Sequence, residues 1–172
     1  MTENGPSPRE VAREALNRLQ SLADPVKARG AERYFKETVK CFGVRAPEIH
    51  ALAAGLYGRI KGNWTADRAV ELCDILFPRP ELEAKAVGAL ILDRFNKDLG
   101  PGFFAKAKGW LAGDLLDNWA SVDTFCTQTM GAFLERRPAF VERIKAWSFH
   151  RNRWVKRASL VSFIKPAKKA VR

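Results

Sequence analysis

Proline recurs at the start of apolar segments with helical periodicity, and this limits the fold of the chain more than any other feature. Apolar residues lie three and four positions apart in the longer segments, and no Asn-Gly or Asp-Gly turn separates alternating apolar runs. Proline suits the first turn of a helix because the N–H that it lacks has no partner there. Such prolines are Pro25, Pro47, Pro80, Pro101 and Pro138. The pattern predicts a fold built of helices alone.

Connections of only a few residues separate the expected helices, so successive helices should form antiparallel hairpins. Asp24 and Thr65 are the expected N-caps of two of them, because a side-chain oxygen at that position accepts a hydrogen bond from a backbone N–H of the first turn. The helices are expected over about residues 8–22, 25–40, 47–60, 65–77, 80–96, 101–112, 118–136, 138–149 and 151–164.

Length and composition suit a single globular domain. At 172 residues and 47% hydrophobic, the chain can bury a core of its own. We expect one domain over residues 1–172, with residues 1–7 and 166–172 as loose ends. Cys41, Cys73 and Cys126 are too widely spaced for metal ligands and too few for a disulfide framework. With no signal-peptide pattern and no apolar run near the roughly 18 residues of a membrane span, we expect a cytoplasmic protein that does not enter a membrane. We also expect a monomer that needs no metal or cofactor.

Positive charge is concentrated toward the C-terminus. Residues 133–172 hold 12 Lys or Arg and 2 Asp or Glu, which accounts for +10 of the net charge of +11. A polyanionic partner such as nucleic acid fits this asymmetry, because neutralised phosphates release counterions; a solubilising tail is the alternative. Trp154 and four basic residues around it, at an expected helix start, are expected to bind DNA, with the cations facing phosphates; a solvated helix face is the alternative. The four basic residues are Arg151, Arg153, Lys156 and Arg157.

Two segments of the chain resemble each other, "EAKAVGALIL" at 83–92 and "VKRASLVSFI" at 155–164. Each has a basic residue, then a small one, then an apolar stripe, and Lys85 and Arg157 lie 72 positions apart. This spacing suits a helix pair that recurs about every 36 residues, as in a HEAT-type solenoid. We therefore predict an all-α fold, an α-α superhelix of HEAT-like repeats with a concave basic face that binds duplex DNA.

The stretch "LDNWASVDTF" at 116–125 places an aromatic ring and a carboxylate four residues apart. If a helix begins near Asn118, with Asp117 or Asn118 as its N-cap, Trp119 and Asp123 lie on one face, where the helix dipole favours negative charge. A buried tryptophan beside a surface aspartate is the alternative interpretation. No Ser-His-Asp or Cys-His arrangement and no glycine-rich phosphate loop accompanies the pair, and the two histidines lie a hundred residues apart.

Three segments in order carry a resemblance to a known family. They are "ADPVKARGAERYFKETVKCFGVRAPEI", "NWASVDTF" and "LERRPAFVERIKAWSFHRNRWVKRASLVSF". Together they resemble the AlkD-like DNA alkylation repair proteins, which are DNA glycosylases built of HEAT-like repeats, over about residues 24–164. The resemblance implies that Trp119 is the active-site tryptophan, Asp123 the catalytic aspartate and Arg157 a DNA contact. Tyr34 matches an aromatic residue that faces the lesion, although a core tyrosine is an equal alternative.

The sequence departs from the family pattern in two places. Ala120 stands where many members have a further aspartate, and the sequence ends before the repeats that bring another aromatic residue to the site. A weaker or narrower activity is expected if those features matter.

The resemblance implies a monofunctional glycosylase that removes purines alkylated at N3 or N7 from duplex DNA without a deep base-flipping pocket. The residues suit this chemistry, because such a base is already cationic and leaves as a neutral group without a general acid. A carboxylate can then stabilise the positive charge on the sugar and orient water, and an indole adds a cation–π attraction of roughly 0.5 to 2 kcal/mol. The alternatives are a non-catalytic HEAT-like module that binds structured DNA or RNA, and a protein-docking scaffold.

Overall fold

The structure, a computed structural model, describes residues 5–170 and is all-helical in this part, with no strand and one isolated backbone bridge between Lys40 and Glu81. Within the same residues, no helix is long and apolar enough to span a bilayer. The chain divides into two compact units, Met1–Phe95 and Asn96–Arg172, each built of helices packed on one another. The predicted all-α fold is confirmed, and the packing is that of an α-α solenoid. Residues 1–4 and 171–172, predicted as parts of loose ends, lie outside the described residues.

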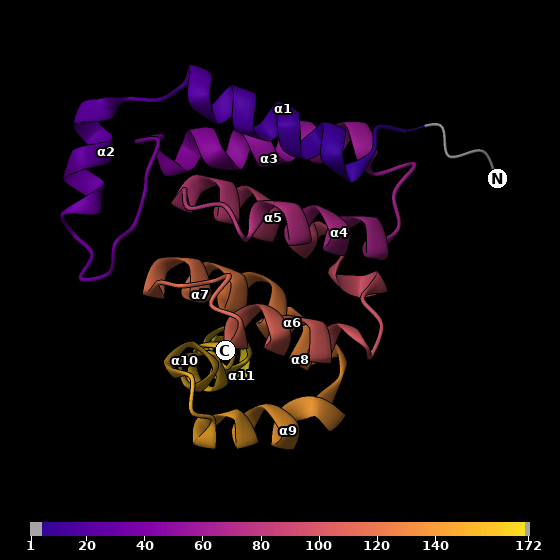
Figure 1. Cartoon of the computed structure of the whole chain (residues 1–172). Helices are drawn as coiled ribbons and strands as arrows, with labels where there is room; N and C mark the ends of the chain where they lie inside the picture. Colours follow the sequence, from indigo (N-terminus) through magenta and orange to yellow (C-terminus); the bar gives the residue numbers. More distant parts are fainter. Residues whose placement is uncertain (1–4, 171–172) are drawn as a thin grey trace. The chain divides into compact units, whose positions relative to one another are not determined.

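Apart from α2, the helices of the first unit pack side by side (Figure 1). The turn at residues 77–81 joins α4 to α5, which pack on each other, while α3 lies against α5 and α1 against α3 and α4. Leu19, Ile60, Leu72 and Ile91, one from each of these helices, are at most 1% exposed, so the three-and-four spacing of the sequence forms this core. The helices are α1 (Pro8–Ser21), α2 (Pro25–Glu32), α3 (Ala46–Ile60), α4 (Ala66–Leu76) and α5 (Leu82–Arg94).

The helix expected over residues 25–40 ends early, at Glu32, so this prediction is wrong in its second half. The following loop is held by a residue distant in sequence. The carboxylate of Glu83, 4% exposed, accepts hydrogen bonds from the N–H groups of Phe42, Gly43 and Val44 at 2.8 to 3.2 Å. Gly43 has φ +82°, a conformation that suits glycine. Long-range hydrogen bonds thus override the local helical pattern.

Side-chain caps explain two of the observed helix starts in this unit, those of α1 and α2. Asp24 accepts from two N–H groups of α2, as predicted. Thr65 occupies the N-cap position of α4, but its side chain makes no capping hydrogen bond. Ser7 and its partner Glu10 form a capping box at the start of α1. Pro80 lies in the turn before α5 and not in the helix itself.

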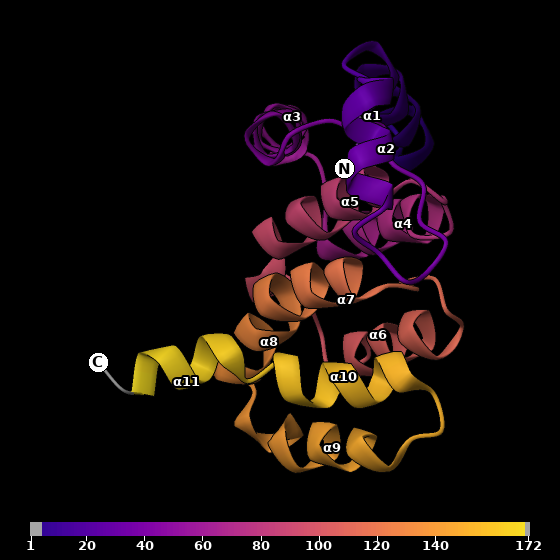
Figure 2. The same ribbon diagram turned by 90° about the vertical axis from the view of Figure 1, so that its left-hand side faces the viewer.

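The second unit has an aromatic core. The ring of Phe103 lies 6.0 Å from Trp110, 6.3 Å from Phe125 and 5.4 Å from Phe133, centroid to centroid, which holds α6 against α7 and α8. Figure 2 shows α10 between α7 and α9. The α-helices of this unit are α6 (Phe103–Ala112), α7 (Trp119–Phe125), α8 (Gly131–Arg136), α9 (Val141–Lys145), α10 (Arg153–Val161) and α11 (Ile164–Ala170), and its other helical turns are η1 (Asn96–Asp98), η2 (Cys126–Met130), η3 (Pro138–Phe140) and η4 (Ala146–Phe149).

Several boundaries in this unit differ from the sequence prediction. The helix expected over 118–136 is interrupted by η2, a π-helical turn, and the helix expected over 138–149 consists of α9 between two 3-10 turns. Residues 166–170, predicted to be part of a loose end, belong to α11, which packs on α8. Gly131 permits this contact, because an added Cβ would lie 3.3 Å from Cβ of Lys165 in α11 and 3.1 Å from the carbonyl oxygen of Ser162, just before it.

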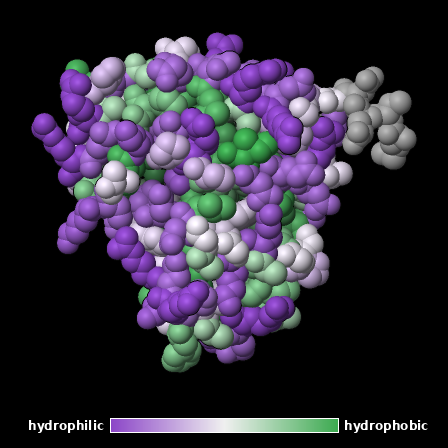
Figure 3. All heavy atoms as spheres, in the orientation of Figure 1, coloured by the Kyte–Doolittle hydropathy of each residue, from purple (hydrophilic) through white to green (hydrophobic). Residues whose placement is uncertain are grey.

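Hydrophilic side chains cover most of the face shown in Figure 3, and hydrophobic ones form small patches, some of them over α1 and α3. The large apolar side chains with the highest exposure are few, and they include Tyr34 at 77% and Phe149 at 90%. Exposed aromatic rings therefore stand out against an otherwise polar surface.

Candidate active site

The start of α7 is fixed by its own sequence. Asn118, 1% exposed, is the N-cap, and its side-chain oxygen accepts a hydrogen bond from the N–H of Ser121 at 2.9 Å. Of the two alternatives expected from the sequence, Asp117 and Asn118, the N-cap is therefore Asn118. Trp119 is the first residue of the helix and Asp123 follows one turn later, so both lie on the same face, and both are half-buried.

Asp123 is held by an arginine from another helix. Nε of Arg157 donates to Oδ1 at 2.6 Å and Nη2 donates to Oδ2 at 2.7 Å, which is a bidentate ion pair between α10 and α7. The two side chains are 40% and 30% exposed, so solvent reaches the pair. A bidentate guanidinium fixes the plane of a carboxylate as well as its position. The structure thus brings together two of the residues singled out from the sequence, an arrangement that sequence spacing did not predict.

The helix changes its winding immediately after Asp123. The hydroxyl of Thr127 donates to the carbonyl oxygen of Asp123 at 2.7 Å, and the π-helical turn begins at Cys126. Such turns are uncommon and occur often at functional sites. Asn96 donates to the carbonyl oxygen of Thr129 at 2.7 Å and so satisfies a backbone acceptor within the turn.

Burial dominates the electrostatics of the thiol behind this turn. Desolvation raises the pKa of Cys126 to about 12, and the negative charge of Asp123 acts in the same direction. The side chain is fully buried, so it stays a neutral thiol at physiological pH. Among residues 5–170, no three His, Cys, Asp or Glu side chains gather as metal ligands would.

The basic segment predicted to meet phosphates begins α10. Asn152 is its N-cap and accepts from the N–H groups of Trp154 and Val155. Trp154 is 6% exposed and belongs to the core, with the guanidinium of Arg153 lying 4.3 Å from its ring centroid. Arg151, Arg153 and Lys156 are exposed, and a phosphate contact by these three cations stays a prediction. The burial of Trp154 leaves little of its ring available to a partner.

Tyr34 lies in the first unit, in the turn after α2. Its side chain is exposed, and its ring meets Phe35 edge to face at 6.3 Å. The exposure argues against a core tyrosine at this position. Its expected approach to a lesion stays a prediction.

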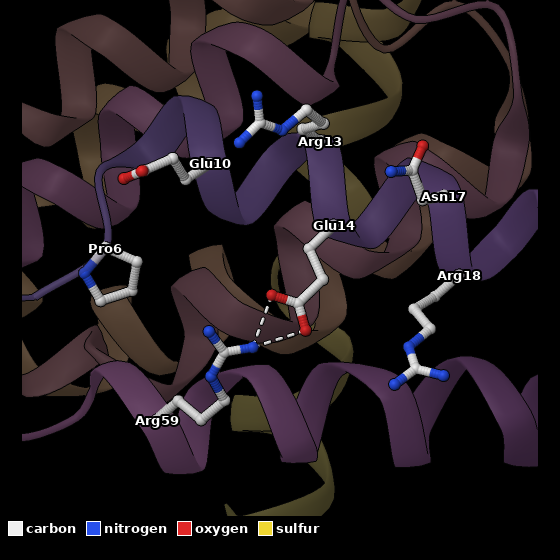
Figure 4. A pocket seen from close by; sticks show the side chains of 7 residues that line it. All are labelled: Pro6, Glu10, Arg13, Glu14, Asn17, Arg18 and Arg59. Atoms are coloured by element: carbon white, nitrogen blue, oxygen red, sulfur yellow. Dashed lines mark hydrogen bonds and ion pairs between the residues drawn. The ribbon is translucent and has the colours of Figure 1, made fainter.

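A hollow of about 380 Å³ lies between α1 and α3 in the first unit, and none of the residues expected to act lines it (Figure 4). Arg59 donates to both carboxylate oxygens of Glu14 across it, while Arg13 points away from this pair. The lining is a mixture of both charges, and the exposed ion pair adds little stability, about 0 to 1 kcal/mol. No convergent set of donors marks this hollow as a site for one class of ligand.

These features define a class of protein. Its described part is all-helical, and its second unit combines an indole and an arginine-paired carboxylate on α7 with exposed cations on the neighbouring α10. The model of the family described as DNA alkylation repair enzyme matches residues 15–172 of the chain. The chain belongs to this family, as the resemblance implied, and acts as an enzyme of DNA alkylation repair with DNA as its substrate. No curated protein matches it.

Proposed function

We propose that the protein is a DNA glycosylase that hydrolyses the N-glycosidic bond of cationic N3- and N7-alkylated purines in duplex DNA. The observation that carries this proposal is the placement of Trp119 and Asp123 one turn apart on α7, with the carboxylate oriented by Arg157. Both residues are half-buried, so a damaged nucleotide could meet them without entering a closed cavity.

The carboxylate of Asp123 would act on the sugar. A cationic alkylpurine leaves as a neutral base, so the group in need of stabilisation is the positive charge that develops on the deoxyribose. A negative charge fixed beside that position lowers the barrier because it needs no reorganisation during the reaction. The same oxygens can orient the water that attacks the anomeric carbon and accept its proton.

Trp119 would present an electron-rich face to the same cation. An indole near a cation contributes roughly 0.5 to 2 kcal/mol. Because the ring stands at the first position of α7, the N-cap formed by Asn118 fixes its backbone. The indole and the carboxylate therefore belong to one short rigid element, which favours a reproducible geometry at the sugar.

Arg157 would serve both the carboxylate and the DNA. A guanidinium has five N–H donors, and pairing with Asp123 through Nε and Nη2 does not in itself prevent a phosphate contact. The exposed Arg151 and Lys156 lie in the same segment and would extend the contact along the strand.

The same ion pair favours a second candidate, a module that binds damaged DNA without releasing the base. A carboxylate neutralised by arginine is weaker as an electrostatic catalyst than a lone one. In this alternative, Asp123 only fixes Arg157 for binding.

Release of free base from methylated duplex DNA distinguishes the two. We expect the protein to release 7-methylguanine, and Asp123→Asn to slow this release by roughly 10²-fold or more while DNA affinity and melting temperature change little. Glu142→Gln is the matched control, because it removes one negative charge from an exposed carboxylate of the same unit. Release at the wild-type rate by Asp123→Asn would remove this residue from the mechanism, and DNA binding without any release would favour the second candidate.

A further inference from the structure

Among the residues that the structure describes, Phe149 is the most exposed of the large apolar side chains, with 90% of its surface accessible. It ends η4, directly before the basic segment that begins α10. Trp147, two positions earlier, is 4% exposed and packs its ring 4.7 Å from that of Phe104. Trp147 therefore fills this part of the core, and the packing of this unit does not require an aromatic ring at position 149.

The turn that carries Phe149 is anchored by hydrogen bonds on its C-terminal side. Nδ1 of His150 accepts from the N–H of Asn152 at 3.1 Å, and the side chain of Asn152 caps α10. Nδ2 of Asn152 also donates to Oδ1 of Asp114 at 2.8 Å, in the loop that leads to α7. An anchored turn presents the exposed ring at a small entropic cost of binding.

The hydrogen bond to Asp114 places this turn at the end of the unit where α7 begins. Figures 1 and 2 both show the α9–α10 connection and the α6–α7 loop on the same edge of the second unit. Trp119 is the first residue of α7, so the edge that carries Phe149 also carries the start of the candidate active site.

The charge around this turn identifies the class of partner. Residues 141–157 contain six Lys or Arg and one Asp or Glu. Arg151 and Arg153, which follow Phe149 by two and four positions, are exposed. An apolar ring among cations suits a partner that carries both negative charge and apolar surface. In a member of a DNA alkylation repair family that partner is nucleic acid, whose phosphates meet the cations and whose bases offer flat faces to a ring.

We propose that Phe149 stacks on a nucleobase exposed by an interruption of the DNA stack, and that this contact favours duplex DNA lacking one base. The proposal rests on the glycosylase function, whose product is such an abasic duplex. In an intact duplex each base face is covered by the neighbouring base pairs, and an aromatic ring can reach such a face only by separating two stacked base pairs. At an abasic site the faces on either side are already uncovered, so no unstacking is required.

The test compares two otherwise identical duplexes, one intact and one with a tetrahydrofuran abasic analogue. Loss of an aromatic stacking contact reduces affinity by roughly 5- to 160-fold. We expect Phe149→Ala to lose this factor on the abasic duplex and much less on the intact one, with an unchanged dependence of affinity on salt, because no charge is removed. Phe149→Tyr keeps the ring and should restore affinity. Leu160→Ala, at a side chain 72% exposed on α10, is the apolar control and should be silent.

Three binding results would overturn the proposal: wild-type affinity of Phe149→Ala for both duplexes, an equal loss on both, or an equal loss in Leu160→Ala. Because the side chain is exposed, the melting temperatures should match, and a lower one in Phe149→Ala would be a fourth contrary result, since it would show a packing role. Release of 7-methylguanine by the wild type is measured separately. Its absence together with ring-dependent abasic binding refutes the glycosylase function and leaves the Phe149 contact standing.

Discussion

Replacing Arg157 with lysine separates its two expected roles, which are to orient Asp123 and to contact a phosphate. Lysine keeps the positive charge but cannot reproduce two parallel N–H···O bonds at 2.6 and 2.7 Å. Exposed ion pairs contribute about 0 to 1 kcal/mol and loss of one partner of a buried pair costs about 3 to 5 kcal/mol. With side chains 40% and 30% exposed, this pair lies near the lower range, and we expect a coupling free energy of about 1 kcal/mol.

The catalytic effect of Arg157→Lys should exceed what this modest loss of stability suggests. A carboxylate free to rotate spends less time in the productive orientation, and a tenfold lower single-turnover rate corresponds to about 1.4 kcal/mol of lost positioning. The dependence of DNA affinity on salt should stay as in the wild type. Arg157→Gln removes the charge and should flatten that dependence by about one unit if the arginine meets a phosphate.

The assays are release of 7-methylguanine under single-turnover conditions, a salt titration of DNA binding, and unfolding of Arg157→Lys, Asp123→Asn and the double variant. Arg136→Lys on α8 is the control, because it makes the same exchange at an exposed position. If Arg157→Lys releases base at the wild-type rate and shows no coupling to Asp123, the ion pair does not orient the carboxylate.

Three further predictions follow from the second unit. Trp119→Leu should lower release of 7-methylguanine roughly tenfold with little change in melting temperature, whereas a silent or unfolded variant would assign the ring to packing. Replacing Arg153 and Lys156 together with alanine should flatten the salt dependence of duplex binding by up to about one unit for each phosphate contact, and an unchanged slope would contradict a phosphate track. Because burial raises the pKa of Cys126 to about 12, its thiol stays protonated in the fold while the unfolded chain ionises near its ordinary value of 9.0. The wild type should therefore lose stability relative to Cys126→Ala by about 1.4 kcal/mol per pH unit from about pH 9 upward. The same difference in free energy of unfolding between the two proteins at pH 8 and at pH 10.5 would refute this.

Helices were predictable where local pattern and tertiary packing agree. The three-and-four spacing gave α1, α3 and α4 to within two residues, because the same apolar stripe that marks a helix in the sequence forms the buried face. The end of α2 was not predictable, because it depends on Glu83, about 40 residues from the N–H groups that it binds. No local propensity encodes such a contact.

The candidate site shows the same division. The four-residue spacing of Trp119 and Asp123 and the Asn118 cap were readable in the sequence, because both are properties of one helix. The ion pair between Asp123 and Arg157 joins residues 34 positions apart on different helices, and it depends on how α10 packs on α7. The burial of Trp154 was not predictable for a related reason, because a tryptophan between arginines in the sequence is equally compatible with a surface and with a core position.

The two similar segments of the chain show why repetition in sequence does not transfer function. Lys85 and Arg157 occupy matching places in these segments, on α5 and α10. Nevertheless, Lys85 is 3% exposed and its ammonium donates to the carbonyl oxygen of Phe77 at 2.8 Å, just past the end of α4. There the cation satisfies a backbone acceptor and is attracted to the negative, C-terminal end of the α4 dipole, so its role is structural. Arg157 meets instead a half-buried carboxylate, because the neighbouring helix supplies Asp123. What distinguishes the candidate site from its counterpart is therefore the residue opposite the cation, and an aspartate at that place is the feature on which the proposed chemistry depends.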